Sequence, residues 1–310
     1  GLPTIIIART IKGKAVEHME DNPQWHGKAA KPEFVPIIEQ ELESQFMIAP
    51  SIIAGDMTNL EKEIKRCADG RADYIHLDVM DGQFVPNKTF DHTKIKQLRP
   101  LTVIPFDTHL MINEPVKYVK DYIDAGSDII TVHTEVCNES SFGEIHDLLK
   151  SNQVSIGLAI NPDTELPDWS KKFLSSLDQL IVMSVIPGQS GQKYIESSHE
   201  KTQKLVKILQ ENQFEGYIEA DGGVTLDNVG ACFADGARVF VGGSAIIGQN
   251  DIRLVIREFR NKILRSRRRL LIQKANELGG IELVNKWIDL HIVGKKKDEL
   301  LQIAKELGYQ

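Results

Sequence analysis

The chain has 310 residues, of which 41% are hydrophobic and 26% charged, and its formal net charge is −7. This composition is typical of a soluble globular protein, and the negative charge argues against a general nucleic-acid binder. No apolar run approaches the roughly 20 residues of a membrane-spanning helix, no signal peptide is recognisable, and the three cysteines fit no disulfide or metal pattern. We therefore expect a cytoplasmic protein with reduced cysteines.

The first 46 residues form a short segment that is too small to bury a core of its own. Its residues 10–16, 19–22 and 25–27 resemble the end of the thiamine-diphosphate-binding half of transketolase. In that family the histidine matching His26 lies near the cofactor diphosphate and the substrate. Because the family's Gly-Asp-Gly cofactor motif is absent, we carry over no thiamine chemistry. We interpret the segment, including Lys12 and His26, as a transketolase-like remnant or linker.

From residue 47, strand-like apolar runs alternate with helical patterns. The pattern predicts eight strands, over residues 47–53, 73–79, 103–111, 128–133, 155–160, 179–185, 217–220 and 238–241. Helical spacing of apolar residues is clearest at 59–68, 115–125 and 199–212. Strands separated by helix-length segments indicate βαβ units and a parallel sheet. Eight units in roughly 215 residues fit a (β/α)8 barrel better than an open sheet.

The last 48 residues or so are expected to form a helical extension, with helices at 263–278, 281–290 and 298–307. The first of these carries a basic cluster at 265–269, which is either a solvated face or a contact surface for a partner. The predicted domains are therefore the segment 1–46, a barrel over 47–262 and the extension 263–310.

Polar side chains that could hold a metal stand at the ends of three predicted strands. His76 and Asp78 are two residues apart in the second strand, so they point to the same face. Asp107 and His109 lie near the end of the third strand, and Asp221 ends the seventh. Catalytic groups of such barrels sit at these strand ends. The two histidines and two of these three aspartates could thus converge on one divalent ion, and imidazole with carboxylate suits Zn, Mn, Co or Fe equally. A buried core histidine beside a turn-capping acid is the alternative interpretation of His76 and Asp78.

Three glycine-rich turns follow the last three strands, at residues 187–192, 222–223 and 242–244. Backbone N–H groups of such turns bind phosphate, and loops seven and eight often hold the substrate phosphate in this fold.

Taken in order, these motifs resemble the ribulose-phosphate 3-epimerase family over residues 47 to about 260. The matching runs are residues 49–51, 76–82, 84–87, 109–111, 133–135, 161–164, 187–188, 191–192, 221–223 and 243–244. The resemblance implies a metal held by four side chains, His76, Asp78, His109 and Asp221. It also implies that Asp78 and Asp221 are the acid/base pair on opposite faces of the substrate.

The same resemblance implies the residues that contact the substrate, which are Ser51, His109, Gly188, Gly191, Gly222, Gly223, Gly243 and Ser244. Met80, Met111 and Met183 match methionines that line the family's pocket, with ordinary core packing as the alternative. The chain departs from the family after the sixth strand, where Ile186 precedes Pro187 and Gln189-Ser190 replace Phe-Gly. Gly188 and Gly191 keep the backbone cradle, but an aromatic side chain over the loop is lost. We expect this change to affect substrate affinity or loop order rather than the reaction type.

The implied activity is metal-dependent 3-epimerisation of D-ribulose 5-phosphate to D-xylulose 5-phosphate in the pentose phosphate pathway. Asp78 would remove the C3 proton to leave an enediolate, and Asp221 would return a proton on the other face. Two alternatives stay open: a six-carbon ketose phosphate such as allulose 6-phosphate as substrate, and a non-catalytic barrel that docks onto a transketolase-like partner. We expect a homo-oligomer that binds neither nucleic acid nor membrane.

Overall fold

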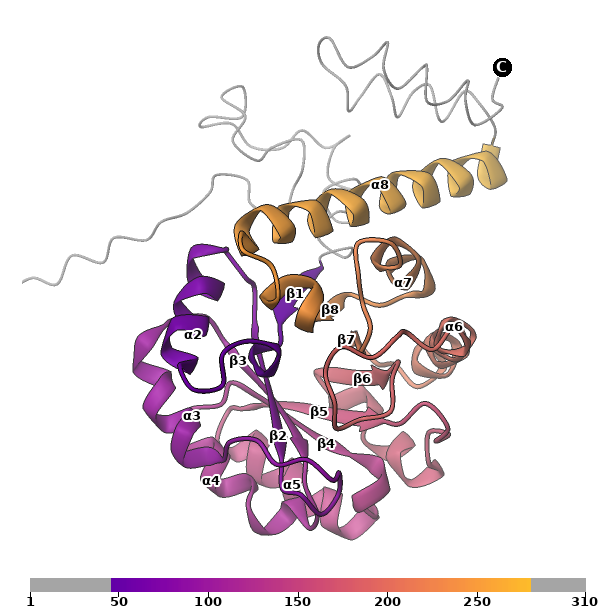
Figure 1. Cartoon of the computed structure of the whole chain (residues 1–310). Coiled ribbons are helices and arrows are strands. Elements are labelled where there is room, and N and C mark those ends of the chain that lie inside the picture. The colour runs from indigo at the N-terminus through magenta and orange to yellow at the C-terminus, as the bar shows by residue number, and fades with distance from the viewer. Residues whose placement is uncertain (1–45, 280–310) are drawn as a thin grey trace, which may run out of the picture. The chain divides into compact units, whose positions relative to one another are not determined.

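The computed structural model describes residues 46–279 (Figure 1). The strands are β1 (Met47–Pro50), β2 (Ile75–Met80), β3 (Phe106–Met111), β4 (Ile129–His133), β5 (Ser155–Ile160), β6 (Gln179–Met183), β7 (Tyr217–Asp221) and β8 (Val239–Gly242). The α-helices are α2 (Leu60–Asp69), α3 (His92–Leu98), α4 (Val119–Asp124), α5 (Glu139–Ser151), α6 (Ser197–Glu211), α7 (Val229–Asp235) and α8 (Ile252–Gly279). The predicted remnant with Lys12 and His26, and the helices predicted at 281–290 and 298–307, lie outside the described residues.

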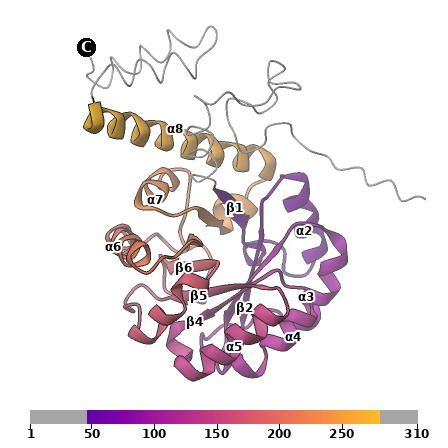
Figure 2. The same ribbon diagram turned by 180° about the vertical axis from the view of Figure 1, so that it is seen from behind.

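All paired strands are parallel, and they follow one another in the order β1-β8-β7-β6-β5-β4-β3-β2. Between β1 and β2 the ring closes through one parallel bridge, from Ser51 to His76, and through the Asp73 N–H, which donates to Ile48 O at 3.0 Å. Helices α2 to α7 surround the strands on the outside (Figure 2). The predicted (β/α)8 barrel is therefore confirmed.

The strands are buried on both faces, which is why they read as nearly continuous apolar runs rather than as alternating patterns. Strand β2 is buried along its whole length, although two of its six residues are His76 and Asp78. Polar groups in such a strand need partners inside the barrel. Their presence near the C-terminal end of β2 marks the site that the barrel builds.

Several elements differ from the sequence prediction in their bounds. The third strand begins at Phe106 instead of residue 103, because the Arg99 guanidinium binds the carbonyls of Thr102 and Ile104, at 2.6 and 2.9 Å, and holds this stretch as a loop. The first strand ends at Pro50, and residues Ile52–Ala54 form a 3-10 turn.

Another difference concerns the helix predicted at 263–278, which is the C-terminal part of the longer α8 (Ile252–Gly279). The Asp251 carboxylate accepts from the Leu254 N–H at 2.9 Å at the start of this helix. Ile252, Ile256, Phe259 and Ile263 recur at helical spacing and are buried. The predicted domain boundary at 262/263 lies inside this helix, and the division into domains stays a prediction. Among residues 46–279, no helix combines the length and the apolar character needed to cross a bilayer.

Candidate metal and acid/base site

Four side chains meet inside the barrel near the C-terminal ends of three strands. They are His76 and Asp78 of β2, His109 of β3 and Asp221 of β7, and all four are buried. We call these four residues the ligand cluster. The parallel register pairs Asp78 with His109 across β2 and β3, which brings the two side chains onto the same face.

The facing atoms of the ligand cluster are too far apart for good hydrogen bonds and well spaced for a shared ion. His76 Nε2 lies 3.3 Å from Asp78 Oδ1 and 3.7 Å from Asp221 Oδ2. His109 Nδ1 lies 3.4 Å from each of the same two oxygens. Tetrahedral ligands at bond lengths of about 2.0–2.2 Å stand about 3.3–3.6 Å apart. Three of the four separations lie in this range, and the fourth, 3.7 Å, lies just above it.

The two imidazole nitrogens also test whether a metal fits. His76 Nε2 and His109 Nδ1 are buried and have no hydrogen-bond partner within residues 46–279. A buried polar atom without a partner is costly and rare in native structures, so two such nitrogens that face the same two carboxylates suit a bound cation. Together with the two carboxylates, they form a cluster that could hold a metal ion. The structure thus brings together the four residues that the sequence selected.

The nitrogen of His76 that faces away from the ligand cluster, Nδ1, contacts a carboxylate. His76 Nδ1 lies 2.7 Å from Asp107 Oδ2, and Gln179 Nε2 donates to Asp107 Oδ1 at 3.0 Å. Burial by itself would lower the pKa of His76, but the carboxylates of Asp78, Asp107 and Glu219 raise it well above its ordinary value. A metal-binding histidine commonly donates its other N–H to a carboxylate in this way. The sequence pointed to Asp107 at a strand end but gave it no role.

Glu219 is a buried acid that sequence reasoning missed. Its Oε1 lies 3.3 Å from His76 Nδ1, and neither carboxyl oxygen has a hydrogen-bond partner in the described part of the chain. Burial, with the nearby Asp107 carboxylate, raises its pKa well above the ordinary value. His76, Asp107 and Glu219 are near enough to be considered a second metal group. The 2.7 Å between His76 and Asp107 is a hydrogen-bond length instead, which makes Asp107 a partner of His76. Its position in the strand could have indicated it, because Glu219 precedes Asp221 by two residues and therefore points to the same face.

The nitrogen of His109 that faces away from the ligand cluster, Nε2, contacts a second histidine. His109 Nε2 lies 2.8 Å from His133 Nε2, and His133 Nδ1 lies 3.1 Å from Glu135 Oε2. Burial lowers the pKa of His133 to about 4, so this ring is neutral at pH 7. Burial would raise the pKa of Glu135, but hydrogen bonds from His133, Thr164 and the Asn161 backbone lower it to about 2. His133 and Glu135 had entered the sequence analysis only as part of a family motif.

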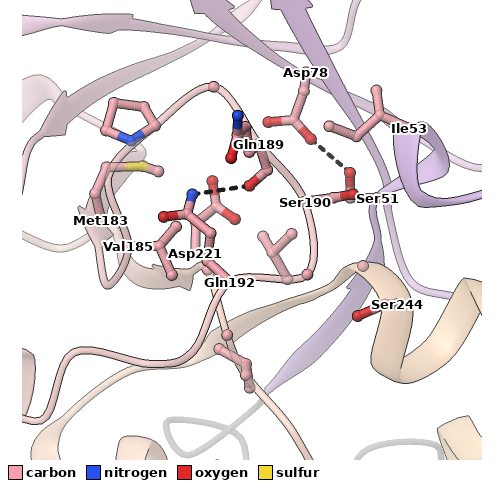
Figure 3. Close-up of a pocket in the computed structure, with 18 of the residues that line it drawn as sticks. Ser51, Ile53, Asp78, Met183, Val185, Gln189, Ser190, Gln192, Asp221 and Ser244 are labelled. Carbon is pink, nitrogen blue, oxygen red and sulfur yellow. Dashed lines mark hydrogen bonds between the residues drawn. The ribbon is translucent and has the colours of Figure 1, made fainter.

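A pocket opens above the ligand cluster and contains most of the predicted substrate-contacting residues (Figure 3). Ser51 Oγ donates to Asp78 Oδ2 at 2.5 Å at its floor. Its lining includes Ser51, Gly188, Gly191, Gly222, Gly223, Gly243 and Ser244, together with Met80, Met111 and Met183. His109, which was also predicted to contact substrate, is fully buried within the ligand cluster.

The glycine turns of the pocket have backbone that other residues rarely adopt. Gly222 has a φ of +108°, and a Cβ on it would lie 2.3 Å from Val185 Cγ2. The adjacent Gly223 has a φ of +65°, and a Cβ there would lie 2.4 Å from Tyr194 N. Only glycine fits both requirements, which explains the Gly-Gly pair directly after β7.

The loop from β6 to α6 (residues 184–196) is held by amide side chains. Gln192 Nε2 donates to Ile186 O at 2.6 Å. It also donates to Gln189 O at 3.0 Å (Figure 3). Asn87 Nδ2, from the segment after β2, donates to Gly188 O at 2.6 Å. These contacts stabilise the loop in which Gln189 and Ser190 stand.

The fold and the site together define a (β/α)8 barrel with a two-histidine, two-aspartate cluster at the floor of a glycine-rimmed pocket. A family model described as the ribulose-phosphate 3 epimerase family matches residues 47–247. The chain is 39% identical over 214 residues to a ribulose-phosphate 3-epimerase of Bacillus subtilis (strain 168), covering 69% of this chain and 97% of that protein. It is 38% identical over 217 residues to the chloroplastic ribulose-5-phosphate-3-epimerase of Arabidopsis thaliana, covering 69% of this chain and 76% of that protein. The chain belongs to the ribulose-phosphate 3-epimerase family, as the motifs predicted.

Among solved structures, a 3-keto-L-gulonate-6-phosphate decarboxylase from Vibrio cholerae superposes with a TM-score of 0.52 at 14% sequence identity. The match covers 71% of this chain and 98% of that one. At this identity the likeness shows the barrel fold alone. The resemblance of residues 1–46 to transketolase stays a prediction.

Proposed function

We propose that the chain catalyses metal-dependent 3-epimerisation of D-ribulose 5-phosphate to D-xylulose 5-phosphate. The observation that carries this proposal is the placement of Asp78 and Asp221 against the same two imidazole nitrogens. The two carboxylates come from β2 and β7, which β1 and β8 separate around the ring. They therefore approach the pocket floor from different sides, which inversion at one carbon requires.

Asp78 is assigned as the base that removes the C3 proton of ribulose 5-phosphate. Its burial by itself would raise its pKa, but His76 and His109 lower the pKa far below the ordinary value. Ser51 donates to its other oxygen. Asp78 is thus charged at neutral pH, as a base must be. Removal of the proton next to the C2 carbonyl leaves an enediolate.

Asp221 is assigned as the acid that returns a proton to the opposite face of C3. In the reverse direction the two aspartates exchange roles. The pair must hold one proton between them for turnover in either direction.

His76, Asp78, His109 and Asp221 would hold one divalent ion, of Zn, Mn, Co or Fe. Such an ion supplies Lewis-acid stabilisation of the negative charge that develops on the substrate oxygens. The histidines contribute neutral donors, and Asp107 and His133 orient them.

The substrate phosphate is assigned to the glycine turns that rim the pocket, with Gly188, Gly191, Gly222, Gly223, Gly243 and Ser244 around it. Their backbone N–H groups suit an anion. Binding the phosphate away from the reacting carbon fixes the sugar for both proton transfers.

The experiment that tests this proposal compares kcat/KM for ribulose 5-phosphate with that for allulose 6-phosphate. A higher value for the five-carbon sugar is expected. A higher value for the six-carbon sugar would transfer the assignment to that substrate, and no turnover of either would contradict it.

The remaining expectations concern the surroundings of the enzyme. A transketolase-like partner is chemically sensible, because xylulose 5-phosphate is also a transketolase substrate, and residues 1–46 or the basic stretch at 265–269 would provide the contact. A homo-oligomer and a cytoplasmic location complete the proposal. Sedimentation of the purified chain, alone and mixed with transketolase, tests the first two.

A further inference from the structure

We propose that His133 is a positioning residue that, held by Glu135, fixes which nitrogen of His109 carries its proton and so keeps Nδ1 free to bind metal. This inference deepens the proposed function and rests on the metal site that it includes. It gives a role to His133 and Glu135, which take no part in proton transfer or in direct metal binding.

The contact between the two histidines has the geometry of a hydrogen bond in the ring plane. Their rings lie at 20° to each other with centroids 4.9 Å apart, and Nε2 to Nε2 is 2.8 Å. Stacked ring faces stay at roughly 3.5 Å or more, so the 2.8 Å contact is edge to edge. One of the two nitrogens must donate and the other accept.

Glu135 decides the direction of this bond. Its Oε1 accepts from the Asn161 N–H at 2.7 Å, and its Oε2 lies 3.1 Å from His133 Nδ1. An ionised carboxylate only accepts, so His133 Nδ1 carries the proton and donates to Glu135. In a neutral ring His133 Nε2 is then the acceptor, and His109 Nε2 must be the donor. In a neutral His109 the remaining nitrogen, Nδ1, therefore presents its lone pair toward Asp78 and Asp221.

The loop after β5 holds the far end of this chain of contacts in place. The Lys201 ammonium donates to the backbone carbonyls of Asn161, Pro162 and Thr164, the last at 2.7 Å. The Asn161 N–H is thereby fixed toward Glu135. Thr134 Oγ1 also donates to Glu135 Oε2, at 3.3 Å, and this hydroxyl can turn to accept instead.

These contacts make Glu135→Gln a sharp test. The amide oxygen is expected to face the Asn161 N–H, because that group can only donate. The amide N–H2 then faces His133 Nδ1 and donates to it, which moves the His133 proton to Nε2. That proton would oppose the proton on His109 Nε2, so metal binding through His109 Nδ1 becomes unfavourable. Glu144→Gln makes the same change of charge on the exposed face of α5 and serves as the matched control.

The first measurement is Co²⁺ affinity of the full chain, determined by competition with a chromophoric chelator at pH 7. We expect Glu135→Gln and His133→Leu to bind Co²⁺ about 10–100-fold more weakly than wild type. His133→Gln, which keeps an acceptor within reach of His109, should retain nearly the wild-type affinity, as should Glu144→Gln. Wild-type affinity in Glu135→Gln would overturn the inference, even if His133→Leu fails to fold.

The second measurement reads the tautomer itself by ¹⁵N NMR of histidine-labelled, zinc-loaded protein. In wild type we expect His133 to carry its proton on Nδ1, and in Glu135→Gln on Nε2. A structural role alone would leave the tautomer unchanged between the two proteins. A wild-type His133 with its proton on Nε2 would overturn the inference.

Turnover of ribulose 5-phosphate by wild type is assayed separately, which keeps the two proposals distinguishable. Absent turnover with the expected Co²⁺ and NMR results rejects the proposed function and supports the inference. Normal turnover with the opposite His133 tautomer rejects the inference and supports the function.

Discussion

The carboxylate of Asp107 and the imidazole of His76 form a fully buried pair, with Oδ2 2.7 Å from Nδ1. Gln179 donates to the other oxygen of Asp107, so the carboxylate has a fixed orientation. The pair directs the second nitrogen of His76, Nε2, at Asp78 and Asp221. The geometry of the ligand cluster thus depends on a residue outside it.

Asp107→Asn should weaken metal binding about 10–100-fold while leaving the fold intact. The amide oxygen would face Gln179 and its N–H2 would face His76, which forces the His76 proton onto Nε2. Co²⁺ titration measures the effect, with Asp69→Asn on the exposed face of α2 as the control. Equal affinities of the two variants would show that Asp107 does not orient His76.

Asp78→Asn and Asp221→Asn should separate the two proton transfers. With ribulose 5-phosphate in deuterated water, Asp221→Asn keeps the base and should exchange the C3 proton without forming xylulose 5-phosphate. Asp78→Asn should lose product formation too, and its rate of C3 proton exchange should fall by about 10²–10⁴-fold. Both variants remove one charge from the ligand cluster, so each controls for the other's effect on metal, and NMR of the sugar measures exchange. Equal exchange in the two variants would contradict the assigned roles.

Metal affinity should fall as the pH falls. Burial alone would lower the pKa of His76 and of His109, but neighbouring carboxylates raise both in the metal-free chain. Below these raised values protons occupy the nitrogens that a metal needs, so binding releases protons and weakens with acid. For each proton that the metal displaces, Co²⁺ affinity falls about tenfold when the pH falls by one unit. Co²⁺ competition across about pH 5–8 measures this change. An affinity that is independent of pH over this range would exclude the two histidines as ligands.

Gly222→Ala should damage the pocket. The new Cβ would lie 2.3 Å from Val185 Cγ2 on a residue with a φ of +108°, so the turn must shift. We expect a stability loss of about 1–3 kcal/mol and a raised KM for the sugar phosphate. Gly143→Ala in α5 is the control, because its Cβ would meet only Phe173 Cζ at 3.8 Å. Thermal unfolding measures the stability loss, and steady-state kinetics measure KM. An unchanged KM in a destabilised Gly222→Ala protein would show that this turn is not part of the phosphate site.

The barrel and the ligand cluster were predictable because both follow from local rules. The alternation of strands and helices indicates parallel units, and the two-residue period of a strand puts His76 beside Asp78. Family motifs then selected His109 and Asp221. The boundaries were less predictable, because tertiary contacts such as the Arg99 guanidinium on the carbonyls before Phe106 decide where β3 begins.

The residues behind the cluster could not be assigned from sequence. The partnership of Asp107 with His76 depends on the register between β2 and β3, and that of His133 with His109 on the next pair of strands. The direction of the His133 hydrogen bond depends further on Glu135 and on a backbone N–H 26 positions later in the chain. These side-chain pairings and hydrogen-bond directions are set only when the strands are assembled.

The measurement that tests the central claim most directly is C3 proton exchange of ribulose 5-phosphate in deuterated water, with the purified chain first stripped of metal and then loaded with Co²⁺. We predict no exchange in the stripped protein, and exchange together with xylulose 5-phosphate formation once one Co²⁺ per chain is bound. A chain that binds one Co²⁺ and leaves the C3 proton in place, or one that exchanges it equally well without metal, would contradict the account.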